Sequence, residues 1–319
     1  MQSTSSTIVI LGTGGTIAGT ASSAADNVGY TAAQIGIAAL VQAVPALAGL
    51  RLEAEQVAQI DSKDMTHAVW LVLAQRVAHH LARADVTGIV ITHGTDTLEE
   101  TAWFLQRVLA PGKPVVLTAA MRPATSAQAD GPQNLLDAVR VAQHPQARGV
   151  VAVLSGAVHG AHDVRKAHPY CLDAFSSGDA GPLAWVAEGV LRCLRPWPDN
   201  TALGLAVLGA DAALWPVVDI VASHAGARSA VIEALCAAGA QGLVVAATGN
   251  GTVHDALGTA LRVAQQRGVP VLLATRCLDG PIVGGPVGLN RLEPLAPATD
   301  LSPVKARIEL MLRLMQPAP

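Results

Sequence analysis

Two short polar segments follow two apolar runs in the first hundred residues. Gly12–Ala18 (GTGGTIA) comes after Ile8–Leu11, and Thr92–Thr97 (THGTDT) comes after Ile89–Ile91. Each apolar run has the length and β-branched composition of a buried strand, and the glycines that follow it mark a turn. Threonine hydroxyls and a carboxylate at such turns are groups that can attack a carbonyl carbon or assist the attack. We therefore expect one site built from both segments.

The second segment also leads into a helix. Asp96 or Thr97 can cap its N-terminus, and Glu99 and Glu100 are favourable in its first turn. A strand that turns sharply into a helix leaves backbone N–H groups and side chains at the carboxyl edge of a sheet. Open α/β sheets bind their ligands at that edge.

Strands and helices alternate along the rest of the chain, which predicts a parallel sheet with right-handed crossovers. The expected strands are short apolar runs at residues 8–11, 52–60, 89–91, 114–118, 150–154, 203–208, 217–221, 242–246 and 269–274. The expected helices have apolar residues at helical spacing and lie near residues 31–45, 65–84, 97–105, 133–143, 227–238, 253–267 and 304–315.

The length and composition are those of a globular protein with two domains. The chain has 319 residues, of which 51% are hydrophobic and 14% charged. The proline-rich segment Leu194–Asn200 is the expected linker. We therefore predict an N-terminal catalytic α/β domain at residues 1–193, a linker at 194–202 and a smaller C-terminal α/β domain at 203–319.

Charge and cysteine content exclude several classes of partner. The net charge is -3 and no basic run is present, so we expect no nucleic-acid or membrane partner. The four cysteines form no CxxC pair, which argues against a structural zinc site and favours a reducing compartment. The N-terminus carries no positive charge before its first strand, so we expect a cytoplasmic protein, or a periplasmic one if a signal peptide has been removed.

Taken together, Gly12–Ala18 and Thr92–Thr97 resemble the two signature motifs of the bacterial L-asparaginase/glutaminase family. The resemblance is strong from about Thr7 to Leu183 and thins in the C-terminal half to Gly249–Gly251 and Lys305–Arg307. It implies a two-domain α/β fold with a larger N-terminal parallel-sheet domain and a smaller C-terminal domain. It also implies hydrolysis of the side-chain amide of L-asparagine to L-aspartate and ammonia, with no cofactor or metal.

Thr16 and Tyr30 are the candidates for the first chemical step. Thr16 in isolation could be a turn threonine whose hydroxyl bonds the backbone, but with both motifs present we interpret it as the nucleophile. Tyr30 could take the proton of that hydroxyl or lie at the rim of the site as an amphipathic residue. The resemblance favours the first role, because family members carry a tyrosine at the end of this loop.

Thr95, Asp96 and Lys166 form a second candidate group. A lysine beside a threonine can accept a proton if burial lowers its pKa, and an aspartate can orient it; a solvated loop lysine is the commoner alternative. The family places a lysine just after an Asp–Val pair, as in Asp163–Lys166. The resemblance implies that Thr95 and Lys166 activate the water that cleaves the acyl-enzyme, and that the backbone of Ala120 contacts the leaving amide.

The resemblance also implies that Ser62 binds the α-carboxylate of the substrate and Asp96 its α-ammonium. Ser62 could equally be a helix N-cap. Lys63 stands where the family usually has glutamine, and it either points into the pocket or is a solvated surface lysine. The family also expects a glutamate in the segment Gly280–Asn290, whereas an ungapped alignment places Val287 there.

Glu293 lies close to this position but is out of register, so it does not replace the missing acid. Losing one anionic contact and gaining the cation of Lys63 should weaken recognition of an α-ammonium. The alternative function is therefore an amidase of the same fold that prefers an ω-amide without an α-amino group, or a glutaminase-asparaginase. Family members form dimers and tetramers with each site between two subunits, so we expect a homodimer or homotetramer. Thr252 is a weak candidate for contact with a neighbour's substrate, with a helix N-cap as the alternative.

Three rival functions are disfavoured. A dinucleotide site would need a third glycine where Ile17 stands, and Asp26 comes too early for the ribose-binding acid. A non-catalytic binding module is disfavoured because the candidate catalytic residues are all present. A metal site is the third rival, and it would use four residues that lie in a polar loop without helical spacing: His159, His162, Asp163 and His168.

Overall fold

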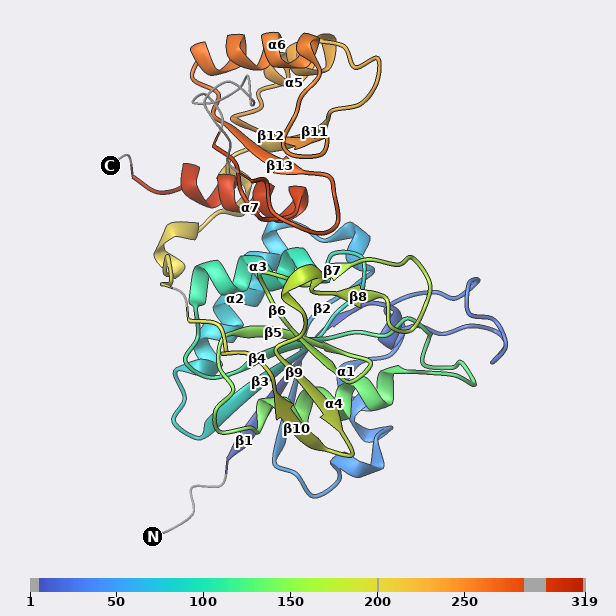
Figure 1. Cartoon of the computed structure of the whole chain (residues 1–319). Coiled ribbons are helices and arrows are strands. Elements are labelled where there is room, and N and C mark those ends of the chain that lie inside the picture. The colour runs from blue at the N-terminus through green and yellow to red at the C-terminus, as the bar shows by residue number, and fades with distance from the viewer. Residues whose placement is uncertain (1–5, 200, 284–296, 318–319) are drawn as a thin grey trace. The chain divides into compact units, whose positions relative to one another are not determined.

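The computed structural model of the chain describes residues 6–199, 201–283 and 297–317 (Figure 1). The chain divides into two compact units, Met1–Ala206 and Val207–Pro319. Each unit is built around its own sheet and its own hydrophobic core.

The larger unit contains an eight-stranded mixed sheet in the order β10-β9-β6-β5-β4-β3-β1-β2. Strands β2, β1, β3, β4 and β5 pair in parallel with one another, whereas β6, β9 and β10 extend the sheet in antiparallel fashion. The strands are β1 (Thr7–Gly14), β2 (Leu52–Ile60), β3 (Val86–Thr92), β4 (Val115–Thr118), β5 (Val150–Leu154), β6 (Ala157–Gly160), β9 (Ala184–Ala187) and β10 (Val190–Cys193).

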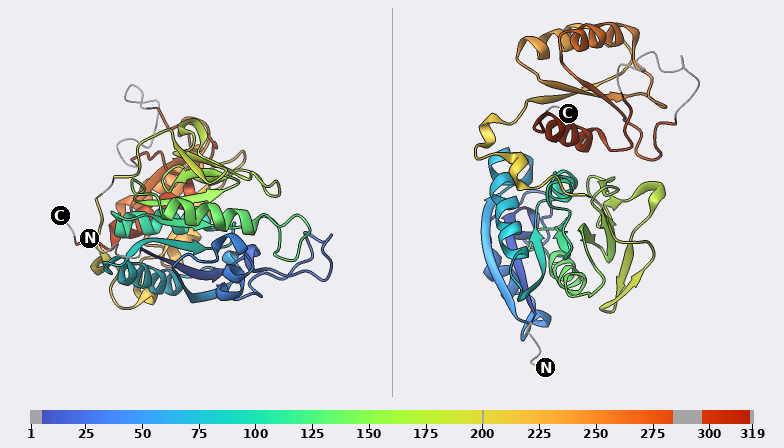
Figure 2. Two further views of the ribbon diagram at one scale, coloured as in Figure 1. Left: turned by 90° about the horizontal axis from the view of Figure 1, so that it is seen from below. Right: turned by 90° about the vertical axis from the view of Figure 1, so that its left-hand side faces the viewer.

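Helices cover both faces of this sheet (Figure 2). On one face, α1 (Ile37–Gln42) and α4 (Gly131–Ala142) share a buried core with the β-branched residues of the central strands. On the other face lie α2 (His67–Leu81) and α3 (Leu98–Leu109), whose Trp70 and Phe104 rings stack 5.0 Å apart. Strands buried on both faces are typical of a parallel sheet and explain the continuous apolar runs in the sequence.

The antiparallel part of the sheet was not predicted from the alternation of elements. Two-residue turns at Ser155–Gly156 and Glu188–Gly189 join β5 to β6 and β9 to β10, and all four residues have positive φ. Such turns connect antiparallel strands, because a parallel connection needs a crossover of a dozen or more residues.

Two predicted elements differ from the structure. The helix expected from Thr31 begins at Ile37, whose N–H donates to Gln56 Oε1 (2.8 Å), while the backbone of Thr31 pairs with that of Thr20. The expected strand at 203–208 is a 3-10 helix, Leu205–Leu208. The backbone N–H groups of Leu203 and Gly204 are bonded to the last turn of α3, which draws this segment away from any sheet.

The smaller unit is a three-stranded parallel sheet in the order β11-β12-β13. Helices α5 and α6 share a buried core with this sheet, and α7 packs against all three strands. The elements are β11 (Val218–Ala222), α5 (Ala230–Ala237), β12 (Gly242–Ala247), α6 (Asp255–Gln266), β13 (Val271–Thr275) and α7 (Pro303–Leu314), all within a few residues of the predicted positions.

None of the helices within the described ranges combines the length and the apolar composition that a bilayer span requires.

Candidate active site

Three turns meet without space for a side chain at the carboxyl ends of β1, β2 and β3, which are neighbours in the sheet. A Cβ atom added to Gly15 would overlap the backbone of Gly94, and one added to Gly94 would overlap the side chain of Ser62. Gly15 also has φ 81°, a conformation that side chains disfavour. The two predicted motifs therefore form one structure, together with the turn that contains Ser62.

Thr16 and Tyr30 face each other in this structure. The Thr16 Oγ1 and Tyr30 hydroxyl oxygens are 2.7 Å apart, and Thr16 is buried at the start of a 3-10 helix, Thr16–Ala18. Tyr30 ends the loop that leaves this helix. The backbones of Thr20 and Thr31 are paired by two hydrogen bonds of 2.9 Å, which close the loop and bring Tyr30 back to Thr16.

Lys166 reaches the second motif from a separate two-stranded ribbon. It lies on β7 (Arg165–Lys166), which pairs with β8 (Phe175–Ser176). Its Nζ donates to Thr95 Oγ1 (2.8 Å) and Asp96 Oδ1 (2.5 Å). Thr95 is buried, Lys166 is largely buried and Asp96 is half-exposed, so the hydrogen bonds of this group run from the protein interior to the surface.

The hydroxyl group of Ser62 is buried and has no hydrogen-bond partner among the described residues. Its side chain is 2% exposed, yet its Oγ makes no hydrogen bond with any described residue. A buried hydroxyl without a partner is costly, so its position beside Gly94 indicates a binding group. Ser62 is not the cap of its 3-10 helix, because Asp61 occupies the cap position and accepts from the Lys63 N–H.

The side chain of Lys63 lies at the surface. It is 60% exposed and its Nζ forms ion pairs with Asp64 (2.6 Å) and Asp61 (3.7 Å). The hydrogen bond to Asp64 and the charge of Asp61 raise the pKa of Lys63 above its usual value. The positive charge of Lys63 is therefore accompanied by two carboxylates within the same turn.

Ala120 lies in a buried turn after β4, and two side chains that we did not predict hold this turn. The Asp130 carboxylate accepts from the N–H groups of Met121 and Arg122, each at 2.9 Å, and Asn134 Nδ2 donates to the Ala119 carbonyl at 2.9 Å. The sequence signal for Asp130 was present in its helix-starting Asp–Gly–Pro, but its partners come from another turn, eight or nine residues earlier. The backbone of Ala120 is thus fixed in place.

His93 holds the turn of the second motif in place through its hydrogen bonds, and we did not predict it as a functional residue. It is fully buried, and burial lowers its pKa to about 4, so the ring is neutral at physiological pH. Nδ1–H donates to the Gly94 carbonyl (2.8 Å), while Nε2 accepts from Thr101, whose hydroxyl accepts from the Trp70 indole. This chain of bonds connects the Gly94 turn to α3 and α2.

The remaining predicted residues belong to the smaller unit or lie outside the described residues. Thr252 belongs to the smaller unit, where its hydroxyl is 2.8 Å from that of Thr248, and the cap of α6 is His254 rather than Thr252. The described residues do not include Val287, which stands where the family's ammonium-binding glutamate was expected, or the nearby Glu293.

The rival sites find no support in the fold. His159 Nδ1 is 2.8 Å from Ser177 Oγ, and His162 Nδ1 donates to Asp163 Oδ1. His168 Nδ1 instead accepts two backbone N–H groups. Within residues 6–199, 201–283 and 297–317, no group of three or more His, Cys, Asp or Glu residues could hold a metal ion. The glycine turn after β1 leads into a three-residue 3-10 helix, not the long helix of a dinucleotide site.

Comparison with known proteins identifies the family. Residues 7–198 match the family model described as "Asparaginase, N-terminal", and residues 217–318 match "Glutaminase/Asparaginase C-terminal domain". Together the two models account for both structural units.

Relatives and a solved structure agree with this match. The chain is 37% identical to "L-asparaginase 2" of Bacillus subtilis, over 96% of this chain and 82% of that protein. It is 38% identical to "Glutaminase-asparaginase" of Pseudomonas fluorescens biotype A, over 96% and 86% of the two chains. The crystal structure of a probable cytoplasmic L-asparaginase from Campylobacter jejuni superposes with a TM-score of 0.91 at 37% identity, covering 98% of this chain and 96% of that one. The chain therefore belongs to the asparaginase/glutaminase family of hydrolases.

Proposed function

We propose that this protein hydrolyses the side-chain amide of L-asparagine to L-aspartate and ammonia through an acyl-enzyme on Thr16. The observation that carries this proposal is the packing of Gly15 on Gly94, which unites the Thr16–Tyr30 pair with the Lys166–Thr95–Asp96 group. Two separate hydroxyl groups, each with its own proton-exchanging partner, match a reaction in two halves.

In the first half-reaction, Thr16 Oγ1 attacks the amide carbon as Tyr30 takes its proton. The contact of 2.7 Å between their oxygens is within the reach that proton transfer needs. Ammonia leaves with a proton returned to the nitrogen, next to the fixed backbone of Ala120. The backbone N–H groups of Thr95 and Asp96, in the turn that precedes α3, stabilise the negative charge on the carbonyl oxygen.

In the second half-reaction, a water molecule attacks the acyl carbon. The Thr95 hydroxyl takes a proton from this water as it passes its own proton to Lys166, which takes part as the unprotonated amine. That proton returns through Thr95 to Thr16 Oγ1 as the bond between Thr16 Oγ1 and the acyl carbon breaks. The products are L-aspartate and the free enzyme. Asp96 orients Lys166 through the bond of 2.5 Å.

Ser62 and Asp96 hold the substrate on either side of the reacting carbon. The unpartnered Ser62 hydroxyl donates to the α-carboxylate, and the half-exposed Asp96 carboxylate accepts from the α-ammonium. Lys63 lies one residue from this clamp and tunes its charge. Because Asp61 and Asp64 accompany Lys63, the turn keeps a net negative charge, which favours L-asparagine over an amide without an amino group.

We also propose a homodimer or homotetramer with each site completed by a second subunit, and a cytoplasmic location. Light scattering on the protein as it elutes from a size-exclusion column measures its mass and so tests the assembly. Fractionation of cells that express the full chain tests the location, with recovery in the periplasm as the contrary result.

Ammonia release from L-asparagine, L-glutamine, D-asparagine and succinamate tests the substrate. We expect L-asparagine to be preferred, Thr16→Ala to abolish turnover, and Lys63→Gln to change the KM for L-asparagine more than that for succinamate. Thr259→Ala, on the exposed side of α6, is the matched control and should retain full activity. Preference for succinamate, or turnover by Thr16→Ala, would overturn the assignment.

Trapping with hydroxylamine tests the acyl-enzyme. Hydroxylamine competes with water for an acyl group on Thr16, so the wild-type protein should form aspartyl hydroxamate in proportion to the hydroxylamine added. Ammonia release should stay constant or rise as the trap speeds the second half-reaction. Absence of hydroxamate at saturating asparagine would indicate direct attack by water.

A further inference from the structure

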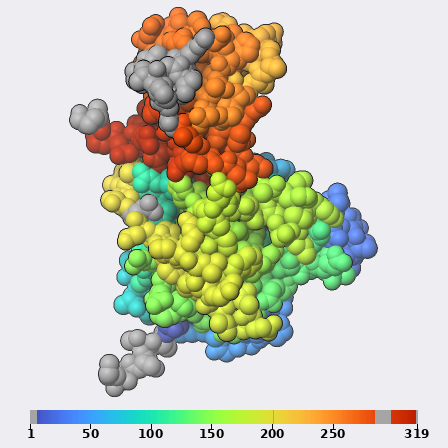
Figure 3. Space-filling view, in the orientation of Figure 1, coloured from blue at the N-terminus to red at the C-terminus, as the bar shows by residue number. Residues whose placement is uncertain are grey.

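The segment that carries Lys166 is a ribbon projecting from the main sheet. We call residues 164–180 the Lys166 ribbon; it contains β7 and β8 and lies between β6 and β9 in the sequence. In Figure 3 this part of the chain, light green, lies on the surface of the larger unit. The two strands of the ribbon pair over two residues each, and the N–H groups of Ala167 and His168 donate to the Ala174 carbonyl, so few internal hydrogen bonds fix the ribbon.

One arginine closes the base of this ribbon. Arg195 Nη1 donates to Asp163 Oδ2 (3.0 Å) and to the carbonyl of Gly181 (2.8 Å). Asp163 is the residue before the ribbon and Gly181 the residue after it, so a single guanidinium group ties both ends. Arg195 is itself anchored, because its backbone N–H donates to the carbonyl of Leu183.

Asp163 needs this partner. Its side chain is only 17% exposed, and burial alone would raise its pKa, but hydrogen bonds from His162 and Arg195 hold the pKa below its usual value. Asp163 therefore stays ionised, and a buried carboxylate that loses a partner moves toward solvent or protonates. Either response would shift the chain three residues before Lys166.

A second contact keeps the ribbon folded independently of this clamp. His159, on β6, is hydrogen-bonded through Nδ1 to Ser177 Oγ at 2.8 Å, and both residues are buried. Removing Arg195 should therefore loosen the ribbon without detaching it. Arg195 is 36% exposed, so its truncation leaves no sealed cavity.

We propose that Asp163 and Arg195 are positioning residues that hold Lys166 against Thr95, an inference that rests on the proposed role of Lys166. The bond from Lys166 Nζ to Thr95 Oγ1 is 2.8 Å, and a displacement of about 1 Å would break it. Thr16 and Tyr30 belong to other segments and would not move. Loss of the clamp would therefore slow the second half-reaction and spare the first.

Single-turnover kinetics of Arg195→Met test this proposal. With enzyme in excess, ammonia formation reports acylation and aspartate formation reports deacylation. We expect deacylation to fall about ten-fold, acylation to stay within about two-fold, and Arg195→Lys to recover part of the loss because its ammonium can still reach one acceptor. Asp163→Asn should show the same selective defect.

The control is Arg148→Met, which breaks another arginine–aspartate pair of the same unit, the exposed contact of Arg148 with Asp199 at 3.8 Å. It should leave both steps unchanged. Equal losses in acylation and deacylation by Arg195→Met, or an unchanged deacylation rate in both clamp variants, would overturn the proposal.

A double-mutant cycle with Lys166→Met separates this inference from the proposed function. If Arg195 acts through Lys166, then Arg195→Met should cause no further loss of deacylation in the Lys166→Met protein. Additive losses would overturn the positioning role. Unimpaired deacylation by Lys166→Met alone would instead refute the assigned role of Lys166 and, with it, the inference.

Discussion

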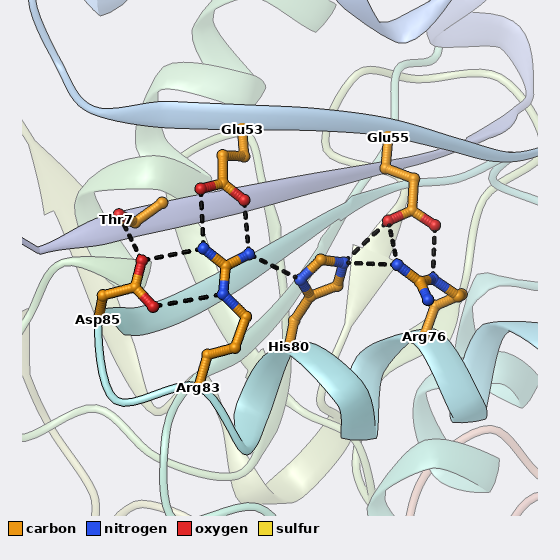
Figure 4. A network of polar contacts seen from close by, with 7 residues as sticks. All are labelled: Thr7, Glu53, Glu55, Arg76, His80, Arg83 and Asp85. Carbon is orange, nitrogen blue, oxygen red and sulfur yellow. Dashed lines mark hydrogen bonds and ion pairs between the residues drawn. The ribbon is translucent and has the colours of Figure 1, made fainter.

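Replacing Glu55 by glutamine should destabilise the larger unit at neutral pH but not in strong acid. Glu55, on β2, accepts hydrogen bonds from Arg76 Nε (2.6 Å) and Nη2 (2.9 Å) and from His80 Nε2 (2.8 Å) (Figure 4). His80 is 5% exposed, and its Nδ1 accepts from Arg83, which binds Glu53 on the same strand. The network thus fastens α2 to the edge strand of the sheet.

The size of the effect follows from the pKa of Glu55. Hydrogen bonds from Arg76, and then from His80, lower this pKa from 4.5 to about 2 despite partial burial. A shift of this size corresponds to at most about 3 kcal/mol at neutral pH. Because the Glu55 side chain is 31% exposed, solvent screens the interaction, and we expect Glu55→Gln to cost about 1.5 kcal/mol.

The pH dependence has a definite sign. The folded pKa of Glu55 lies below the unfolded one, so its stabilisation is complete above about pH 4.5 and is lost as the pH falls toward about 2. Urea unfolding followed by tryptophan fluorescence, at one protein concentration, measures the full effect at pH 7 and its reduction to about a quarter at pH 2.5. Trp70, also on α2, reports on this region.

The matched control is Glu188→Gln, an exposed glutamate in the turn between β9 and β10, which should change the free energy of unfolding by less than about 0.5 kcal/mol. The reasoning would be refuted if Glu55→Gln cost the same at both pH values. A cost at pH 7 no larger than that of the control would refute it as well.

Three other changes test the packing around the site. Gly15→Ala should abolish ammonia release and destabilise the fold by about 2 kcal/mol or more, because its Cβ would overlap Gly94. Gly49→Ala is the control: Gly49 has a similar φ of 85° but open space around it, so this change should cost only the backbone strain of about 1 kcal/mol. Histidine NMR should show His93 neutral with Nδ1 protonated at pH 7 and titrating near pH 4, and a measured pKa above 6 would contradict its burial. The free energy of unfolding should fall as the pH drops from about 6.5 to 4, because only the unfolded state binds the proton in that range. Asp130→Asn should lower kcat several-fold and the free energy of unfolding by about 1–2 kcal/mol, since two N–H groups lose a charged acceptor, and unchanged thermal unfolding would contradict this.

Local patterns predicted the elements whose partners are also local. The strand at Leu52–Ile60 was placed to the residue, because turns bound it on both sides, and Val150–Leu154 likewise. The 203–208 segment has the same apolar composition as a strand, but hydrogen bonds to the end of α3 make it a 3-10 helix. Composition alone does not contain such a contact.

The same distinction applies to the site. The two motifs named Thr16, Thr95 and Asp96 because glycines and hydroxyls at strand ends are visible in the sequence. The residues that hold the surrounding turns in place were not predictable, since their hydrogen bonds reach beyond the strand or helix next to them. Asp130 contacts a turn eight or nine residues away, and Arg195 contacts Asp163 across 32 residues of sequence.

The close packing of Gly15 on Gly94 has a consequence for how this enzyme could be altered. A larger residue at either glycine would push the proposed nucleophile and the proposed water-activating pair apart at once. The two half-reactions therefore cannot be tuned separately by substitution at the junction. Directed evolution of substrate range should succeed instead at the loop before Tyr30, which is held to its neighbour by contacts such as Ser126 Oγ with Asn27 Oδ1 and Ala21 N–H with Thr125. Libraries confined to that loop should yield many more active variants than libraries at the two glycines.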